Sequence, residues 1–196
     1  MIGVYLTHPQ VLVDASIPVP EWGLSETGRT RLIAIRQRPW VRSLAGVVSS
    51  AERKAKEAAA ILAGAAGIEF RTVAEMGEND RSATGYLPPP EFEKAADWFF
   101  ANPQQSFRGW ERAVDAQVRI VAAFKAAMEG WPPDRPVAFV GHGAVGTLLK
   151  CHLAGAPIAR STDQPAGGGN VFAFRLSDRR LLCDWTPVET FTGEFG

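Results

Sequence analysis

The chain has 196 residues, of which 46% are hydrophobic, and its formal net charge is zero. This length and apolar content are enough for one full core, so we expect a single domain over residues 1–196. Without net charge there is no reason to expect a nucleic acid or an anionic membrane as a partner. No apolar run approaches the roughly 20 residues of a membrane span, and the N-terminus opens directly into a strand pattern, so a soluble, cytoplasmic protein is expected. The two cysteines, Cys151 and Cys183, lack C-x-x-C spacing and are expected to be reduced, buried thiols.

Strand and helix patterns alternate along the chain. Strands are expected at residues 2–6, 46–48, 68–73, 136–140, 171–176 and 180–185, the last two as a closing hairpin. Helices are expected from a Ser25 cap to a stop at Pro39, from capping-box spacing at residues 49–52 to Gly64 or Gly67, and over residues 91–101, 110–128 and 143–153. This alternation predicts an α/β fold of three layers, with a mostly parallel central sheet covered by helices on both faces. Residues 79–110 are the stretch expected to form a lid or insert.

Two of the three histidines follow strand-like apolar runs. Val4-Tyr5-Leu6-Thr7-His8-Pro9 and Val137-Ala138-Phe139-Val140-Gly141-His142-Gly143 each indicate a buried strand that ends on a histidine. Sites in parallel α/β sheets form at the carboxyl ends of the strands. Two imidazoles at one edge of the sheet therefore indicate paired chemistry.

The residues around the second histidine also spell a dinucleotide-binding pattern. Residues 141–146 read G-x-G-x-x-G between a strand and a helix. A nucleotide-cofactor oxidoreductase would need a further parallel strand ending in an acidic residue. Asp163 lies near the expected distance, but no apolar strand precedes it, and only about 50 residues follow the motif. We expect instead that the glycines allow a tight turn and the approach of an anion to the helix N-terminus.

Four motifs in order resemble the histidine phosphatase superfamily, which has the phosphoglycerate mutase-like fold. Thr7-His8-Pro9 stands for Arg-His-Gly, and residues 24–29 (Leu-Ser-Glu-Thr-Gly-Arg) match Leu-[Ser/Thr]-x-x-Gly-Arg. Residues 49–59 are similar to Ser-Ser-x-x-x-Arg-Ala-x-x-Thr-Ala, and Gly141-His142-Gly143-Ala144 to [Ser/Gly]-His-Gly-Gly. The resemblance covers nearly the whole chain.

This resemblance implies a role for each motif residue. His8 would attack phosphorus and carry a phosphohistidine, and His142 would hold a phosphate oxygen. A loop carboxylic acid would protonate the leaving alcohol; Glu78 is the preferred candidate, with Glu75 and Asp80 as alternatives. No metal and no cofactor would be needed, and the partner would be a small phosphorylated substrate or a phosphoprotein, with a homodimer left open.

The chain departs from the family pattern at three positions. Thr7 replaces the arginine before the nucleophile, Pro9 replaces the glycine after it, and Lys54 replaces the second arginine. Arginine binds phosphate with a rigid two-pronged fork that neither lysine nor threonine offers. The expected substrate-binding residues are Thr7, Lys54, Arg53, Gly143 and Arg81, with Arg108 as a further candidate cation. Two functions follow as hypotheses: a metal-independent phosphatase, or a catalytically weakened or inactive phospho-ligand-binding or regulatory protein of the same fold.

Overall fold

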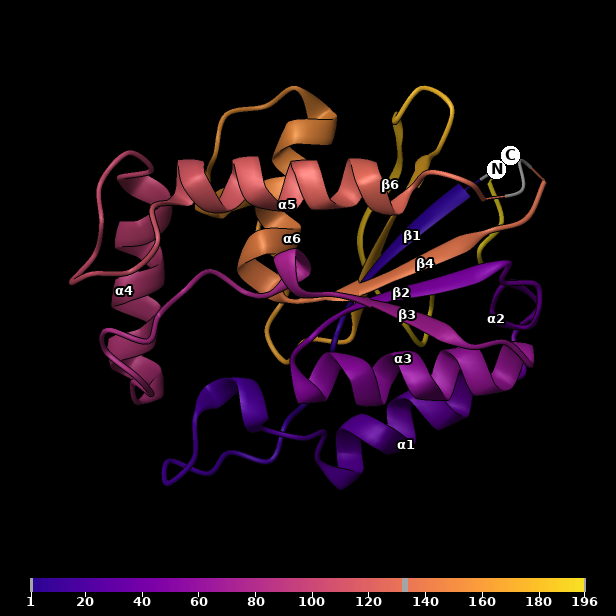
Figure 1. Ribbon diagram of the computed structural model, residues 1–196, viewed down its shortest axis with the longest axis horizontal. Helices are drawn as coiled ribbons and strands as arrows, with labels where there is room; N and C mark the ends of the chain where they lie inside the picture. Colours follow the sequence, from indigo (N-terminus) through magenta and orange to yellow (C-terminus); the bar gives the residue numbers. More distant parts are fainter. Residues whose placement is uncertain (1, 132–133, 196) are drawn as a thin grey trace.

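A six-stranded sheet runs through the centre of the computed structural model, which describes residues 2–131 and 134–195 (Figure 1). Its strands are β1 (Ile2–Thr7), β2 (Gly46–Ser50), β3 (Phe70–Val73), β4 (Val137–Gly141), β5 (Asn170–Arg175) and β6 (Leu181–Pro187). The strand order is β3-β2-β4-β1-β5-β6. The first four strands are parallel, whereas β5 and β6 pair antiparallel, as expected for the closing hairpin. The predicted α/β fold with a mostly parallel sheet is confirmed.

Helices cover both faces of this sheet (Figure 1). They are α1 (Glu26–Ile35), α2 (Pro39–Arg42), α3 (Arg53–Ala66), α4 (Pro89–Ala101), α5 (Ala113–Ala127) and α6 (Gly143–Ala154). Three short 3-10 helices, η1 (Val19–Glu21), η2 (Ala74–Met76) and η3 (Arg160–Thr162), lie in the connections. Helices α1 to α3 pack on one face and α5 and α6 on the other. Among the described residues, no helix is both long enough and apolar enough to cross a membrane.

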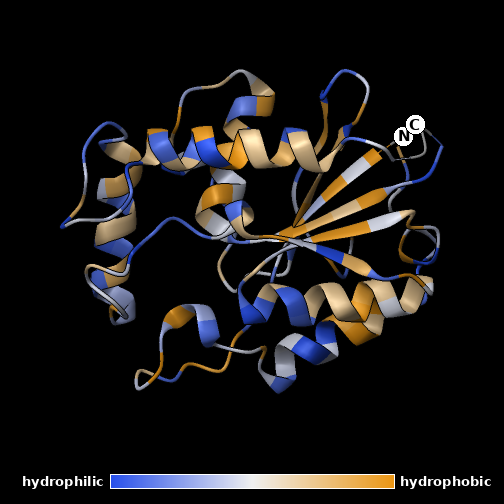
Figure 2. Cartoon of the chain, in the orientation of Figure 1, coloured by the Kyte–Doolittle hydropathy of each residue, from blue (hydrophilic) through white to orange (hydrophobic). Residues whose placement is uncertain are grey.

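Successive side chains of each central strand point to opposite faces of the sheet and pack into two separate cores. Phe139 of β4 packs toward α5 and α6, whereas its neighbours Ala138 and Val140 pack toward α1 to α3. All three side chains are fully buried. A strand that is covered on both faces needs a continuous apolar run, which explains why these strands are mostly orange and pale in Figure 2.

Phe139 is expected to be a large contributor to stability. Its ring lies 4.7 Å from that of Phe124 on α5 and 6.1 Å from that of Phe174 on β5, centroid to centroid. Phe139→Ala should lower the free energy of unfolding by about 3–5 kcal/mol, since it removes these contacts and leaves a cavity. Urea unfolding measures the change. Val118→Ala, at a position that is 71% exposed, is the control and should change stability by less than about 0.5 kcal/mol; an equal loss in both variants would contradict the assignment.

The helix boundaries follow the local signals only in part. Ser25 caps α1 as predicted, because its side chain accepts a hydrogen bond from the Gly28 amide at 3.1 Å. Pro39 does not stop that helix, which ends at Ile35; instead Pro39 opens the short helix α2, where its missing N–H costs nothing. Gly67, with φ of 69°, ends α3.

The predicted capping box at residues 49–52 is wrong. Ser49 and Ser50 belong to β2 and pair with Thr72 and Val73 of β3. Helix α3 begins at Arg53, and the Glu52 side chain makes no capping hydrogen bond. The ladder of the sheet therefore extends two residues further than the sequence pattern indicated and leaves Glu52 free for another contact.

Residues 79–110 contain α4 and the loops on either side of it, at the left of Figure 1. Phe99, Phe100 and Trp110 are buried in the same core as α5. The aromatic rings of this segment pack mainly on one another, and the Trp110 indole N–H donates to the Thr84 hydroxyl at 2.8 Å. Pro132 and Pro133, between α5 and β4, lie outside the described residues.

Candidate active site

The two strand-terminal histidines meet at one edge of the sheet. Strands β1 and β4 are parallel neighbours, and the His8 amide continues their ladder by donating to the Gly141 carbonyl at 3.0 Å. The ring centroids of His8 and His142 lie 5.2 Å apart, with the rings inclined at 68°. The structure thus places the two imidazoles together at the carboxyl ends of the strands.

The contacts of His8 define which of its nitrogens is free. Its Nδ1 lies 2.9 Å from the Pro9 carbonyl oxygen. A carbonyl only accepts hydrogen bonds, so Nδ1 carries the proton and Nε2 keeps its lone pair. Burial, opposed by the Pro9 carbonyl and aided by the charge of Lys54, lowers the pKa of His8 to about 4. A neutral His8 is therefore available as a nucleophile near pH 7.

His142 is fully buried at the start of α6. Its Nε2 lies 2.6 Å from the Ser50 hydroxyl and 3.3 Å from Oε1 of Glu52. The Tyr5 hydroxyl fixes its backbone, accepting from the His142 amide and donating to its carbonyl, each at 3.1 Å. Burial holds the pKa of His142 well below the ordinary value.

These depressed pKa values predict how stability depends on pH. In the unfolded chain His8 takes up a proton near pH 6.5, whereas in the folded chain its pKa is about 4. Between these values the unfolded state binds more protons, so the free energy of unfolding should fall as pH decreases from 6.5 toward 4. His142 contributes with the same sign. Urea unfolding at pH 7, 6 and 5 should show a shallower decline for His8→Asn than for the wild type; identical slopes would contradict this account.

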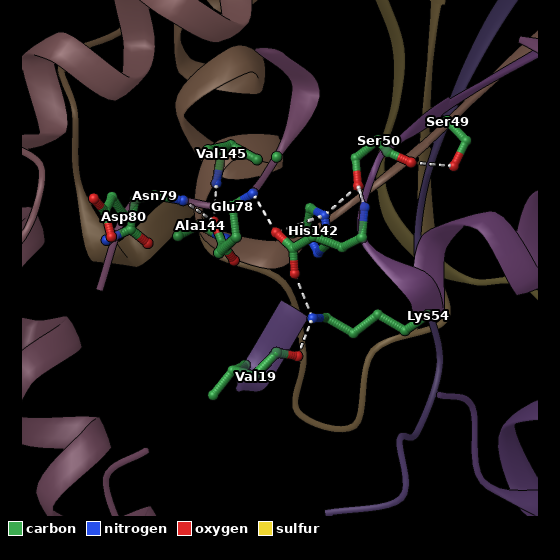
Figure 3. Close-up of polar contacts among 12 residues, drawn as sticks. Val19, Ser49, Ser50, Lys54, Glu78, Asn79, Asp80, His142, Ala144 and Val145 are labelled. Carbon is green, nitrogen blue, oxygen red and sulfur yellow. Dashed lines mark hydrogen bonds and ion pairs between the residues drawn. The ribbon is translucent and has the colours of Figure 1, made fainter. Parts of the chain in front are cut away.

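The Glu78 carboxylate lies at the N-terminus of α6. It accepts hydrogen bonds from the amides of Ala144 at 3.2 Å, Val145 at 3.1 Å and Asn79 at 3.0 Å (Figure 3). The partial positive charge of a helix N-terminus attracts such an anion. The anion expected at this helix start is thus supplied by the protein itself.

The two alternative acids make no hydrogen bond or ion pair with either site histidine among the described residues. Glu75 is exposed, and its side chain makes no hydrogen bond or ion pair among the described residues. Asp80 is also exposed and accepts from the Ser82 amide at 2.8 Å. Of the three candidates, only Glu78 is connected to the site, through its amide, which donates to Glu52 at 2.8 Å.

Glu52 is a site residue that the sequence patterns did not indicate. Its Oε1 accepts the Glu78 amide and contacts His142, while its Oε2 forms an ion pair with Lys54. Lys54 is 4% exposed and also donates to the Val19 carbonyl at 2.9 Å (Figure 3). Burial acts against ionisation of Glu52, but His142, Lys54 and the Glu78 amide together lower its pKa to about 2. The capping-box interpretation had assigned this side chain to the helix end.

Thr7 lies beside the site, but its hydroxyl is used within the protein. It is 1% exposed and donates to the Gln164 side-chain oxygen at 2.6 Å. It also accepts from the Asn170 amide at 3.1 Å. These bonds tie the end of β1 to β5 and the loop before it, so Thr7 supplies no free donor in place of the arginine.

Of the candidate arginines, two lie on the surface and one lies near the pocket. Arg53 is exposed and forms an ion pair with Glu57 at 3.0 Å, and Arg108 is exposed and stacks on Phe107. Arg81 is half-buried, 5.0 Å above the Phe92 ring, and its charge contributes to the lowered pKa values of both histidines. Besides Lys54, Arg81 is therefore a predicted cation within electrostatic reach of the histidines, whereas Arg53 lies on the surface.

A further arginine, which is not among the candidates from the sequence, binds the loop that carries Glu78. Arg119 of α5 donates to the carbonyls of Glu75, Gly77 and Glu78, at 2.7, 2.9 and 3.2 Å, and pairs with Glu111 at 2.7 Å. It thereby fixes the loop that carries Glu78. Only its contacts reveal this role, because its spacing on the helix is that of an ordinary surface residue.

The glycines around His142 have a packing role in addition to the predicted approach of an anion, which the Glu78 carboxylate makes at the start of α6. A Cβ on Gly141 would lie 2.3 Å from the Tyr5 hydroxyl, and one on Gly146 would lie 2.5 Å from the Tyr5 ring. Gly143 begins α6, and a Cβ there would meet the Gln164 side chain at 2.5 Å. These glycines make room for neighbouring side chains. The strand after α6 is antiparallel, whereas a dinucleotide-binding unit has a parallel strand at that place.

Comparison with known proteins identifies the family. A model of the histidine phosphatase superfamily, branch 1, matches residues 18–183. The matched range contains Lys54, Glu78 and His142, whereas His8 precedes it. No curated protein matches the chain.

Several solved structures share the fold. A mycobacterial glucosyl-3-phosphoglycerate phosphatase in complex with inorganic phosphate is 23% identical, with a TM-score of 0.77 over 97% of this chain and 99% of that one. YhfR of Bacillus stearothermophilus is 19% identical, with a TM-score of 0.73 over 92% and 93%. "Mycobacterial hydrolase 2" is 23% identical, with a TM-score of 0.72 over 88% and 80%. These similarities show a shared fold, and the family match over most of its length shows that the chain belongs to the histidine phosphatase superfamily, branch 1.

Proposed function

We propose that the protein is a metal-independent phosphomonoester phosphatase that acts through a phosphohistidine on His8. The observation that carries this proposal is the free Nε2 lone pair of His8 beside the buried ring of His142. Family membership and the phosphatase among the structural neighbours support it.

The reaction has two steps. His8 Nε2 forms a bond to phosphorus while the bond from phosphorus to the ester oxygen breaks, and the leaving oxygen takes a proton from the carboxyl group of Glu78. Water then attacks phosphorus and the bond to Nε2 breaks, while the proton of the water returns to Glu78. His142 and Lys54 stabilise the charge on the phosphoryl oxygens, and Arg81 adds to the positive field.

A second function is favoured by the contacts of the phosphate-binding candidates. The Thr7 hydroxyl is occupied, Lys54 is paired with Glu52, and Arg53 lies on the surface. Three amides also hold Glu78 as an acceptor rather than a donor. These features fit a phospho-ligand-binding or regulatory protein in which catalysis is weak or lost.

Trapping of the intermediate separates the two functions. The full-length protein is incubated in EDTA with p-nitrophenyl phosphate and a panel of small phosphomonoesters and phosphopeptides, then quenched and analysed by peptide mass spectrometry. Turnover with phosphate attached to His8 is the expected result. Turnover without modified His8 would overturn the mechanism, and binding of phosphate without turnover would establish the binding protein.

The substrate class follows from the same panel. The segment 79–110 is proposed as the cover of the site, because its Arg81 acts on both histidines. A small substrate would be enclosed by this segment, whereas a phosphoprotein would have to pass it.

We place this activity in the cytoplasm, where Cys151 and Cys183, both free, would remain reduced.

A further inference from the structure

We propose that the Glu52 carboxylate is an internal anion that occupies the phosphate-binding position, so that a phosphate group must displace it from Lys54 and His142. The proposal rests on the proposed function, since it concerns the same pocket. It makes Glu52 a residue that sets which ligands the site accepts.

The contacts of Glu52 carry this inference. Its two carboxylate oxygens approach the two groups expected to hold phosphate, Oε2 at Lys54 and Oε1 at 3.3 Å from His142 Nε2. A third donor, the Glu78 amide, reaches Oε1 at 2.8 Å. Figure 3 shows the Lys54 side chain reaching toward the region of His142 and Glu78. A carboxylate that is bound by a cation, an imidazole and an amide imitates a bound oxyanion.

This occupation neutralises Lys54, the cation expected to bind an incoming phosphate. Lys54 is 4% exposed, and its other partner is the neutral Val19 carbonyl. Among the described residues, Glu52 is thus the anion that neutralises it. A phosphate that binds beside an undisplaced Glu52 would meet a negative charge in a buried site, which is strongly unfavourable.

Displacement is feasible because the occupant is a side chain and each donor keeps another partner, Lys54 the Val19 carbonyl and His142 the Ser50 hydroxyl. Glu52 precedes α3 and is 13% exposed at its side chain, so rotation of its side-chain bonds can move the carboxylate toward solvent. Lys54 and His142 would then keep their places for the phosphate. Protonation cannot achieve the same release at ordinary pH. Lys54, His142, His8 and Arg81 face the carboxylate or its neighbours, and its pKa is about 2.

The site should therefore favour ligands that gain binding energy outside the phosphate group. Inorganic phosphate has no such contacts and must release Glu52 unaided, so it should bind weakly and inhibit little as a product. A phosphomonoester with a large leaving group can offset the displacement through contacts with the surrounding loops.

Binding of inorganic phosphate to Glu52→Gln tests the proposal. Glutamine keeps the size and one acceptor oxygen of glutamate but removes the charge. Titration calorimetry should show phosphate bound at least about tenfold more tightly by this variant than by the wild type, because a charge-assisted contact no longer has to be broken. Glu69→Gln is the matched control, because Glu69 is exposed and carries no hydrogen bond or ion pair among the described residues. Its phosphate affinity should equal that of the wild type. Glu52→Asp, whose shorter carboxylate reaches Lys54 less well, should give an intermediate gain and provides a second variant if the first fails to fold.

Each result is decisive for the proposal. Tighter binding by Glu52→Gln supports it, even if no variant turns over substrate, in which case the proposed function fails alone. Weaker or equal binding by Glu52→Gln and Glu52→Asp overturns it and shows that Glu52 positions Lys54, and turnover that depends on His8 would then leave the proposed function standing. Absence of phosphate binding in every variant overturns the proposal, and it overturns the proposed function as well only if no turnover that depends on His8 is found.

Discussion

Replacing His8 with alanine is expected to lower kcat for p-nitrophenyl phosphate by at least about a thousandfold. The variant retains His142, Lys54 and the field of Arg81, but it lacks the atom that bonds to phosphorus. No other imidazole can take its place, because His142 is fully buried with its Nε2 directed at Ser50 and Glu52. Steady-state rates in EDTA measure the loss, and unfolding in urea shows that the variant remains folded.

The third histidine provides the matched control for this prediction. His152 is exposed on α6, ten positions after His142, and it contacts neither histidine of the site. His152→Ala should retain wild-type turnover. If His8→Ala retained more than about a tenth of the wild-type rate, the phosphohistidine mechanism would be wrong.

Replacing Glu78 with glutamine is expected to slow substrates selectively, according to their leaving group. Alkyl phosphomonoesters need a proton at the leaving oxygen, so their kcat should fall by about 10²–10⁴-fold. p-Nitrophenolate leaves without protonation, so its release should change little. The Ala144 and Val145 amides bind different oxygens of Glu78, so glutamine, with one acceptor oxygen, keeps a hydrogen bond to the start of α6 but loses the other. Parallel measurements of kcat with both substrate types distinguish the proton-donor role from a purely structural one.

Two further carboxylates serve as controls for Glu78. Glu75→Gln and Asp80→Asn remove the same charge from exposed positions of the same loop, and both should leave kcat unchanged for either leaving group. A uniform loss for all substrates in Glu78→Gln would indicate that this carboxylate only holds the helix terminus. A selective loss in either control would identify that residue as the proton donor.

The elements and the family followed from the sequence because their signals are local. Buried strands covered on both faces require unbroken apolar runs, such as residues 137–140, and such runs are visible without any tertiary information. Parallel strands bring their carboxyl ends to one edge, so the meeting of His8 and His142 could also be anticipated. The four motifs in order then indicated the histidine phosphatase superfamily.

The tertiary structure decided which charged side chains face the pocket. A shift of two residues in where β2 ends turned Glu52 from a predicted helix cap into a ligand of Lys54 and His142. The same local geometry sent Arg53 to the surface, while long-range bonds to Gln164 and Asn170 occupied Thr7. Sequence patterns specify which residue types lie near a strand end, but the direction of each side chain depends on the pleat, the first helical residue and partners more than a hundred positions away. The sequence by itself therefore determined the fold and the histidine pair, and only the packed structure decided which charges face it.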